Sequence, residues 1–119
     1  MSKPVAKKKV LSKADFMQLK TSVKSVEIPE LGEVFIKTMT AAERESLEKQ
    51  MQKEVDNNGV RAVIFIYSVC DENGVLEFND DDLQTVKNFP SSIVSTVFDF
   101  SNDINGINAE AKEYAAKNW

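Results

Sequence analysis

Acidic side chains gather in the second half of the chain, where residues 71–82 hold six carboxylates and no basic residue. Such a set could bind magnesium, or two of its members could pair for general acid–base catalysis in a cleft that shifts one pKa. These carboxylates instead fall in a turn, Asp71–Gly74, and at a helix start, Asn79–Asp82. Acids at a helix start satisfy backbone N–H groups and suit the helix dipole. The pattern therefore favours an exposed acidic face over a catalytic pair.

The same segment partly follows the spacing of an EF-hand calcium loop. With Gly74 at the glycine position, Asp71 and Asn73 would be side-chain ligands and Asp80 the terminal acid. The first ligand position then falls on Val69, which cannot coordinate calcium, and the last position lacks the longer bidentate glutamate. A turn followed by an acid-rich helix start accounts for every residue, so the sequence predicts no bound metal and no cofactor.

The chain contains no histidine and a single cysteine, Cys70. This composition excludes histidine-based zinc sites, Cys-His and Ser-His-Asp catalysis, and an internal disulfide. Cys70 ends an apolar run and has no histidine to activate it, so we interpret it as a small core residue. We expect a protein that is not an enzyme and has no catalytic residues.

A basic N-terminal arm precedes an acidic body. The 119 residues carry a net charge of −4, and residues 1–24 hold seven lysines and one aspartate, which leaves −10 for the remainder. The lysine cluster lacks arginine and interleaved aromatic residues, so it does not indicate nucleic-acid binding. We expect residues 1–11 to form a flexible arm that contacts the acidic body or an acidic partner, with Lys7, Lys8 and Lys9 as candidate partner-binding residues.

Length and hydropathy indicate one small domain. No apolar run approaches the roughly 20 residues that cross a bilayer, and no hydrophobic stretch follows the basic N-terminus as in a signal peptide. We therefore expect no membrane association and a reduced, cytoplasmic location.

The first part of the chain predicts a short helix and a β-hairpin. Ser12–Asp15 have the form of a capping box, and a helix over about residues 13–23 is predicted after it. This helix would carry three apolar side chains on one face: Phe16, Leu19 and Val23. Residues 25–37 contain two runs of alternating apolar and polar residues joined by a segment with Pro and Gly, which predicts a hairpin with one buried face.

Two helices are expected in the middle of the chain. Thr40–Glu43 form a second capping box, followed by an apolar stripe of Leu47, Met51 and Val55. Residues 60–70 are the most apolar segment. Their length and their position after a helix favour a mostly buried helix, although their β-branched residues favour a central strand.

The last part of the chain predicts further helices. After a short extended stretch at 75–78, Asn79–Asp82 give a third cap. The clearest amphipathic helix follows, with its stripe at Ile93, Val97, Phe100 and Ile104. Residues 109–119 have few apolar anchors and are expected to be a loosely held helical tail, in which Tyr114 and Trp119 are candidate partner-binding residues.

Together these patterns predict an α+β fold. We expect a single domain over residues 12–108, in which an N-terminal β-hairpin packs against a bundle of about four to five helices.

Four segments also carry a family resemblance. Residues 26–44, VEIPELGEVFIKTMTAAER, would form a hairpin that runs directly into a capped helix. The apolar segment 60–70 with its CDENG exit, the FNDDDL helix start at 78–83 and the closing DINGI at 103–107 follow in order. In this order the segments, which span residues 24–108, resemble the tail assembly chaperones of long-tailed bacteriophages. The basic arm and the first helix are less typical of that family.

The resemblance implies a non-catalytic assembly factor. It would bind the phage tape measure protein, keep it soluble and help to recruit tail-tube subunits, acting in the host cytoplasm and absent from the mature virion. A small acidic domain suits such a role because its charge opposes aggregation, and weak multivalent contacts bind by avidity yet release stepwise. We hypothesise that the helical body binds the tape measure and that the C-terminal tail contributes to recruitment.

Other classes remain open at this stage. The chain could be a structural or adaptor protein of the same particles, such as a neck or tail-completion subunit, or a small acidic regulatory binding module. The family resemblance and the loosely anchored ends of the chain are also compatible with self-association into a homo-oligomer, through exchange of terminal elements.

Overall fold

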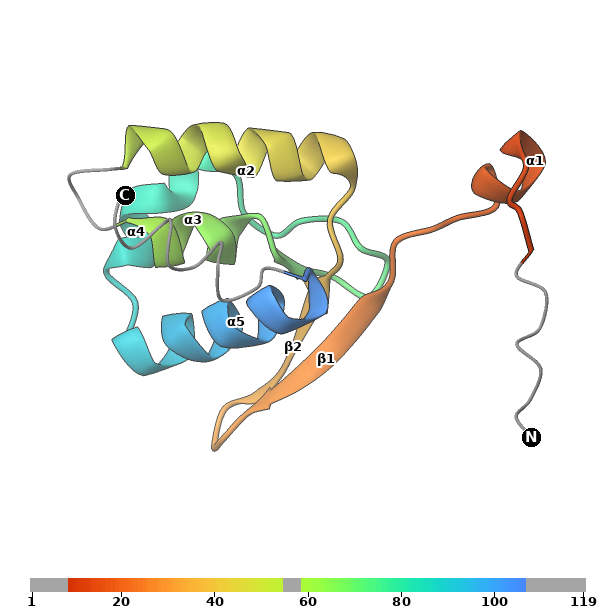
Figure 1. The fold of residues 1–119 in the computed structure, drawn as a ribbon. Helices are drawn as coiled ribbons and strands as arrows, with labels where there is room; N and C mark the ends of the chain where they lie inside the picture. The colour runs from red at the N-terminus through yellow and green to blue at the C-terminus, as the bar shows by residue number, and fades with distance from the viewer. Residues whose placement is uncertain (1–8, 55–58, 107–119) are drawn as a thin grey trace, which may run out of the picture.

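The computed structural model describes residues 9–54 and 59–106. Within these residues the fold is α+β, as predicted, with five α-helices and a three-stranded antiparallel sheet of order β1-β2-β3 (Figure 1). The elements in chain order are α1 (Lys13–Phe16), β1 (Val23–Ile28), β2 (Gly32–Lys37), α2 (Ala41–Lys53), α3 (Val60–Ile66), β3 (Val69–Cys70), the 3-10 turn η1 (Asp80–Asp82), α4 (Leu83–Lys87) and α5 (Ser91–Ile104).

The predicted hairpin is present as β1 and β2. Its turn lies between Ile28 and Gly32, which oppose each other, and the Leu31 N–H donates to the Ile28 carbonyl at 2.9 Å. Glu30 has a φ of 70°, a left-handed conformation that suits a tight turn. Alternation along the strands buries Ile28 and Ile36 on the inner face, as the sequence indicated.

The first helix is shorter than predicted. The capping box forms, because Ser12 Oγ accepts from the Asp15 N–H at 3.3 Å and Asp15 Oδ2 accepts from the Ser12 N–H at 2.9 Å. However, α1 ends at Phe16, and Val23 belongs to β1 instead of the helix. Phe16 and Leu19 are exposed, so the described part of the chain offers little packing that would stabilise further helical turns, and short helices are marginal without such packing.

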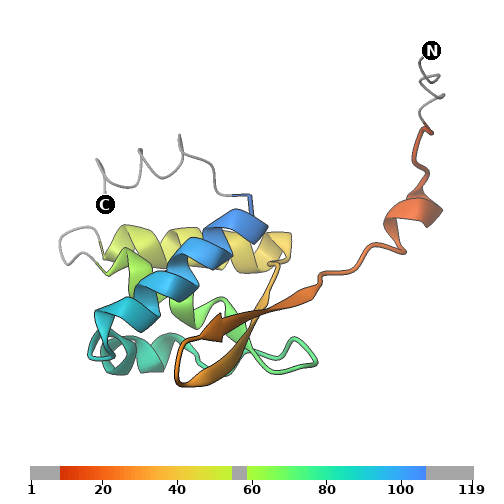
Figure 2. The same ribbon diagram turned by 90° about the horizontal axis from the view of Figure 1, so that it is seen from below.

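The core lies between the inner face of the sheet and the helices, with α3 in contact with α2, α4 and α5 (Figures 1 and 2). The predicted stripes of α2 and α5 are confirmed, because Leu47 and Val97 are fully buried and Met51 is half-buried. Val55, the last member of the α2 stripe, lies outside the described residues. Among the helices that the structure describes, none is long and apolar enough to cross a membrane.

The apolar segment 60–70 divides between a helix and a strand. Its first seven residues form α3, but Val69 and Cys70 form β3 and pair with β2, so the predicted helix is wrong for these two residues. The Lys37 N–H donates to the Ser68 carbonyl at 3.0 Å, where the chain leaves the helix. The free edge of β2 supplies these backbone partners, and tertiary pairing thereby overrides the helical preference.

Candidate functional site

Residues 9–22 project away from the rest of the domain, and we call them the projecting segment (Figures 1 and 2). Seven large apolar side chains are exposed in the described residues, and five of them lie on this segment. These five are Val10, Leu11, Phe16, Met17 and Leu19, exposed by 49% to 89%. The other two, Leu31 and Val75, lie in turns. Concentrated exposed apolar side chains of this kind mark a contact surface for another protein segment.

The projecting segment is also basic. Lys9, one of the predicted partner-binding residues, forms an exposed ion pair with Asp15 at 3.1 Å. The backbone hydrogen bond from Ser12, together with Lys9, lowers the pKa of Asp15. Lys13 and Lys20 form no ion pair with any described residue. These two ammonium groups are thus the charges that the segment can offer to another surface.

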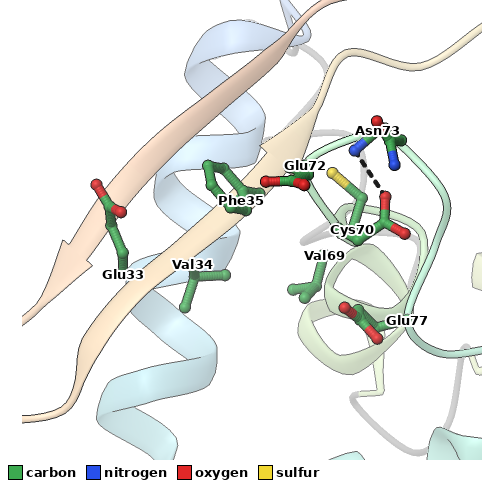
Figure 3. Close-up of a pocket in the computed structure, with 9 residues that line it drawn as sticks. Glu33, Val34, Phe35, Val69, Cys70, Glu72, Asn73 and Glu77 are labelled. Atoms are coloured by element: carbon green, nitrogen blue, oxygen red, sulfur yellow. Dashed lines mark hydrogen bonds between the residues drawn. The ribbon is translucent and has the colours of Figure 1, made fainter.

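A groove of about 420 Å³ lies beside β2, between its first half and the loop that follows β3 (Figure 3). Its apolar lining comes from the two strands, and its carboxylates come from β2 and the loop. The apolar members are Val34, Phe35, Val69 and Cys70, and the acidic members are Glu33, Asp71, Glu72 and Glu77. We call it the acidic groove.

The acidic groove runs along an open strand edge. β3 has two residues and pairs only with Phe35 and Ile36, so β2 has no strand partner on this side at Glu33. Alternate residues of a strand turn their backbone groups to the same side, and the Lys37 N–H points toward β3. The N–H and C=O of Glu33 therefore also face this side, and they have no backbone partner there among the described residues.

The loop at 71–75 is held by its own aspartate. Asp71 Oδ1 accepts from the N–H groups of Asn73 at 2.8 Å and Val75 at 3.0 Å, and Gly74 takes a φ of 83°. The Asp71 carboxylate therefore stabilises the turn through these two hydrogen bonds, in agreement with the turn predicted at Asp71–Gly74. The described residues contain no cluster of three or more histidine, cysteine or acidic side chains arranged to hold a metal.

Cys70 lies in the wall of the acidic groove, close to several carboxylates. It is only 3% exposed, and this burial is the main cause that raises the pKa of its thiol above the usual value. The charges of Asp71 and Glu77 raise the pKa further, while Lys37 lowers it. A buried, protonated thiol packs as a small apolar group, which is the role the sequence suggested.

The acidic residues of 71–82 serve two separate purposes. Asp80 and Asp82 of η1 are structural, because Asp82 Oδ2 accepts from the Asn79 N–H at 2.8 Å and Asp80 Oδ1 accepts from the Tyr67 hydroxyl at 2.9 Å. Burial and this contact with Asp80 raise the pKa of Tyr67 to about 12. By contrast, Glu72 and Glu77 make no side-chain hydrogen bond or ion pair within the described residues. Their charges are available to a ligand in the acidic groove.

Only one of the partner-binding candidates chosen from the sequence falls within the described residues. Tyr114, Trp119, Lys7 and Lys8 lie outside the described residues, and Lys9 lies on the projecting segment. The acidic groove was not predicted. Strand alternation could have placed Glu33 and Phe35 on one face, but only the tertiary fold brings the loop beside them.

The arrangement suits recognition of an elongated peptide segment that carries both apolar and basic side chains. Apolar side chains would contact Phe35 and its neighbours, ammonium groups would pair with Glu33 or Glu72, and backbone groups would pair along the edge of β2. No protein-family model, curated protein or solved structure matches this chain.

Proposed function

We propose that this protein is a tail assembly chaperone of a long-tailed bacteriophage. It binds the tape measure protein, keeps it soluble and helps to recruit tail-tube subunits in the host cytoplasm, and it is absent from the mature virion. One observation carries the proposal: segments that resemble this family, although distant in sequence, meet at Asn105.

The contacts at Asn105 join the hairpin, the capped helix and the closing segment. Asn105 Oδ1 accepts from the Met39 N–H at 2.7 Å, and its Nδ2 donates to the Lys37 carbonyl at 3.3 Å. Arg44 Nη1 donates to the Asn105 carbonyl at 3.3 Å. Residues of the first and last family-like segments thus contact one another although they lie more than 60 positions apart in the sequence. These contacts give a structural reason for the two segments to occur in the same chain.

The capping box at Thr40 adds to this support. Glu43 Oε1 accepts from the Thr40 N–H at 2.9 Å, while its Oε2 accepts from the buried Lys37 ammonium at 2.8 Å. Burial alone would raise the pKa of Glu43, but the hydrogen bonds from Lys37 and Thr40 lower it overall. One carboxylate therefore fixes both the end of β2 and the start of α2, a junction that lies within the first family-like segment, residues 26–44.

The surface chemistry is compatible with covering an apolar partner. The large apolar side chains that are exposed in the described residues lie on the projecting segment and on two turns, and none of these lies on α2 to α5. We therefore assign the apolar contacts with the tape measure to these segments in preference to the helical body. The net charge of −4 opposes aggregation of the resulting complex.

The proposal is tested by co-expression with the long, helix-rich product of the neighbouring gene. We expect that partner to become soluble and to co-purify with this chain. The double substitution Phe16→Ser and Leu19→Ser should reduce the soluble fraction, while Gln18→Ser, a matched change on the same exposed segment, should not. A partner that stays insoluble and unbound would contradict the proposal, and finding the chain in purified virions would instead indicate a structural subunit.

A further inference from the structure

We propose that the outer face of the sheet binds an arginine side chain on a segment of another protein. This face lies opposite the core, and on β1 and β2 it carries Ser25, Glu27, Glu33 and Phe35. The inference does not rest on the chaperone function. Its chemistry also differs from that of the apolar contacts assigned to the projecting segment, because it depends on carboxylates and one aromatic ring.

The outer face is open to solvent. Residues directly opposite each other in a sheet carry their side chains on the same face, and the pairs here are Ser25 with Phe35 and Glu27 with Glu33. Phe35 is half-buried and the other three are exposed. Figure 3 shows Glu33 and Phe35 extending from one side of β2, where they also line the acidic groove. A partner side chain can therefore reach them from solvent.

Two carboxylates oppose each other on this face. Glu27 and Glu33 are direct partners in the ladder of β1 and β2, and neither forms an ion pair with a described residue. Like charges at directly opposite positions destabilise a sheet. Lys37 lies further along the same face, but its ammonium group is already paired with Glu43 at 2.8 Å. A cation supplied by a partner would relieve the repulsion between Glu27 and Glu33.

Phe35 makes the face suited to arginine in particular. It lies two residues from Glu33 on the same strand, and Glu27 is its diagonal neighbour on β1, at about 7–8 Å. A guanidinium group stacks its plane on an aromatic ring and donates hydrogen bonds to carboxylates at its edge. An ammonium group is a compact, strongly hydrated charge without such a plane. We therefore expect the face to prefer arginine to lysine.

The acidic groove adds a carboxylate on the other side of the ring. Glu72 belongs to the loop that follows β3, lines the groove together with Phe35, and forms no ion pair with a described residue. Its carboxylate points toward Phe35 in Figure 3. The ring is thus flanked by carboxylates that come from the hairpin and from the loop, an arrangement that complements one guanidinium group.

The arginine has to come from another protein. This chain has two arginines, and both are used within the fold. Arg44 is paired with Glu48 at 3.5 Å, and the Arg61 guanidinium lies 4.6 Å from the centre of the Phe98 ring. Residues 1–24 hold seven lysines and no arginine, so they lack the group that suits the outer face. Charge and shape therefore favour a partner with an exposed arginine over a second copy.

Binding of short peptides to the purified full chain tests the proposal. The probes share one blocked sequence, acetyl-Gly-Ser-Val-Xaa-Val-Ser-Gly-amide, in which Xaa is arginine, lysine or the uncharged analogue citrulline. NMR titration of the isotope-labelled protein gives the dissociation constants and maps the contact. The arginine peptide should bind at least about threefold more tightly than the lysine peptide, with shifts at β1 and β2, and the citrulline peptide should not bind.

Variants of the face separate its two components. Glu27→Gln with Glu33→Gln should raise the dissociation constant of the arginine peptide about tenfold. Glu45→Gln, the matched loss of an exposed carboxylate on α2, should not change it. Phe35→Leu should abolish the preference for arginine over lysine while binding of both peptides persists. Glu33→Gln should also raise the midpoint of thermal unfolding, because it ends the repulsion from Glu27.

Three results would overturn the proposal. Equal binding of the arginine and lysine peptides would mean that the face recognises charge alone, so that the lysine-rich first 24 residues of a second copy would serve equally well. Binding that survives the double glutamate substitution, or that shifts resonances away from the hairpin, would place the contact elsewhere. A lowered unfolding midpoint for Glu33→Gln would show that this carboxylate stabilises the fold instead of awaiting a ligand. No tape measure protein is present in these titrations, so their failure would leave the chaperone proposal intact.

Discussion

The hydroxyl oxygens of Ser68 and Ser101 lie 2.6 Å apart in the core, and both residues are fully buried. Ser68 Oγ also lies 2.6 Å from the Ile64 carbonyl, to which it can donate its single hydrogen. Ser101 therefore donates to Ser68 and accepts in turn from Asn105 Nδ2 at 3.1 Å. This chain of hydrogen bonds ties α5 to the end of α3 and continues through Asn105 to Met39.

Removing the Ser101 hydroxyl should destabilise the fold. Ser101→Ala leaves the Asn105 amide without one acceptor and Ser68 without a donor, and we expect a loss of about 1–2 kcal/mol in the free energy of unfolding. Urea titration measures the loss, and Ser91→Ala at the exposed start of α5 is the control. The double variant S68A/S101A should lose less than the sum of the two single losses. Additive losses would show that the hydroxyls do not interact.

Position 59 has no room for a side chain larger than that of glycine. Its φ is not positive, but a Cβ there would lie 2.6 Å from Glu54 Oε1 and 2.8 Å from Lys87 Cε. These atoms belong to an ion pair at 2.6 Å that is mostly buried. We expect Gly59→Ala to cost about 1–2 kcal/mol in stability.

The same substitution in a Lys87→Ala background provides the control. There the Glu54 side chain is released from its partner and can move, so the cost of Gly59→Ala should fall by at least half. Thermal or urea unfolding of the four variants gives the coupling. An equal cost in both backgrounds would mean that the ion pair is not the obstacle.

Asn102 is a site where a substitution should stabilise the protein. The residue is fully buried in α5, and neither its amide nitrogen nor its amide oxygen has a hydrogen-bond partner among the described residues. A buried polar group without partners costs roughly 1–3 kcal/mol. Asn102→Leu, whose side chain has the same number and branching of heavy atoms, should raise the midpoint of thermal unfolding. A lowered midpoint would indicate that groups outside the described residues use this amide.

We expect Tyr67 to be the main cause of the loss of folding stability at alkaline pH. Its pKa rises from 10.0 to about 12 in the folded state, chiefly through burial and then through the contact with Asp80. Between these two values the unfolded chain loses the phenolic proton while the folded chain keeps it, so stability falls as the pH rises from about 10 to about 12.

The Tyr67→Phe variant tests this assignment. It should lose less stability than the wild type over that pH range, since it has no phenol to titrate. Urea unfolding at a series of alkaline pH values gives the comparison, with circular dichroism to confirm that both proteins remain folded without urea. Identical pH dependence in the two proteins would exclude Tyr67 as the responsible group.

The helix starts and the hairpin could be predicted from the sequence because they depend on residues a few positions apart. The capping boxes at Ser12, Thr40 and Asn79 each join a side chain to a backbone group within three residues. The buried stripes around Leu47 and Val97 follow from helical periodicity, which the sequence displays directly. These features fixed the α+β class before any long-range contact was considered.

Tertiary structure decided the features that depend on distant partners. α1 ends early because Phe16 stays largely exposed and gains little from burial, and β3 exists because β2 offers an open edge to Val69 and Cys70. The acidic groove combines Glu33 with a loop nearly 40 positions later in the sequence. Asn105 accepts a hydrogen bond from Met39, which lies 66 positions earlier. Local propensity and periodicity carry no information on such contacts, since strand pairing and burial are set by which surfaces the whole chain brings together.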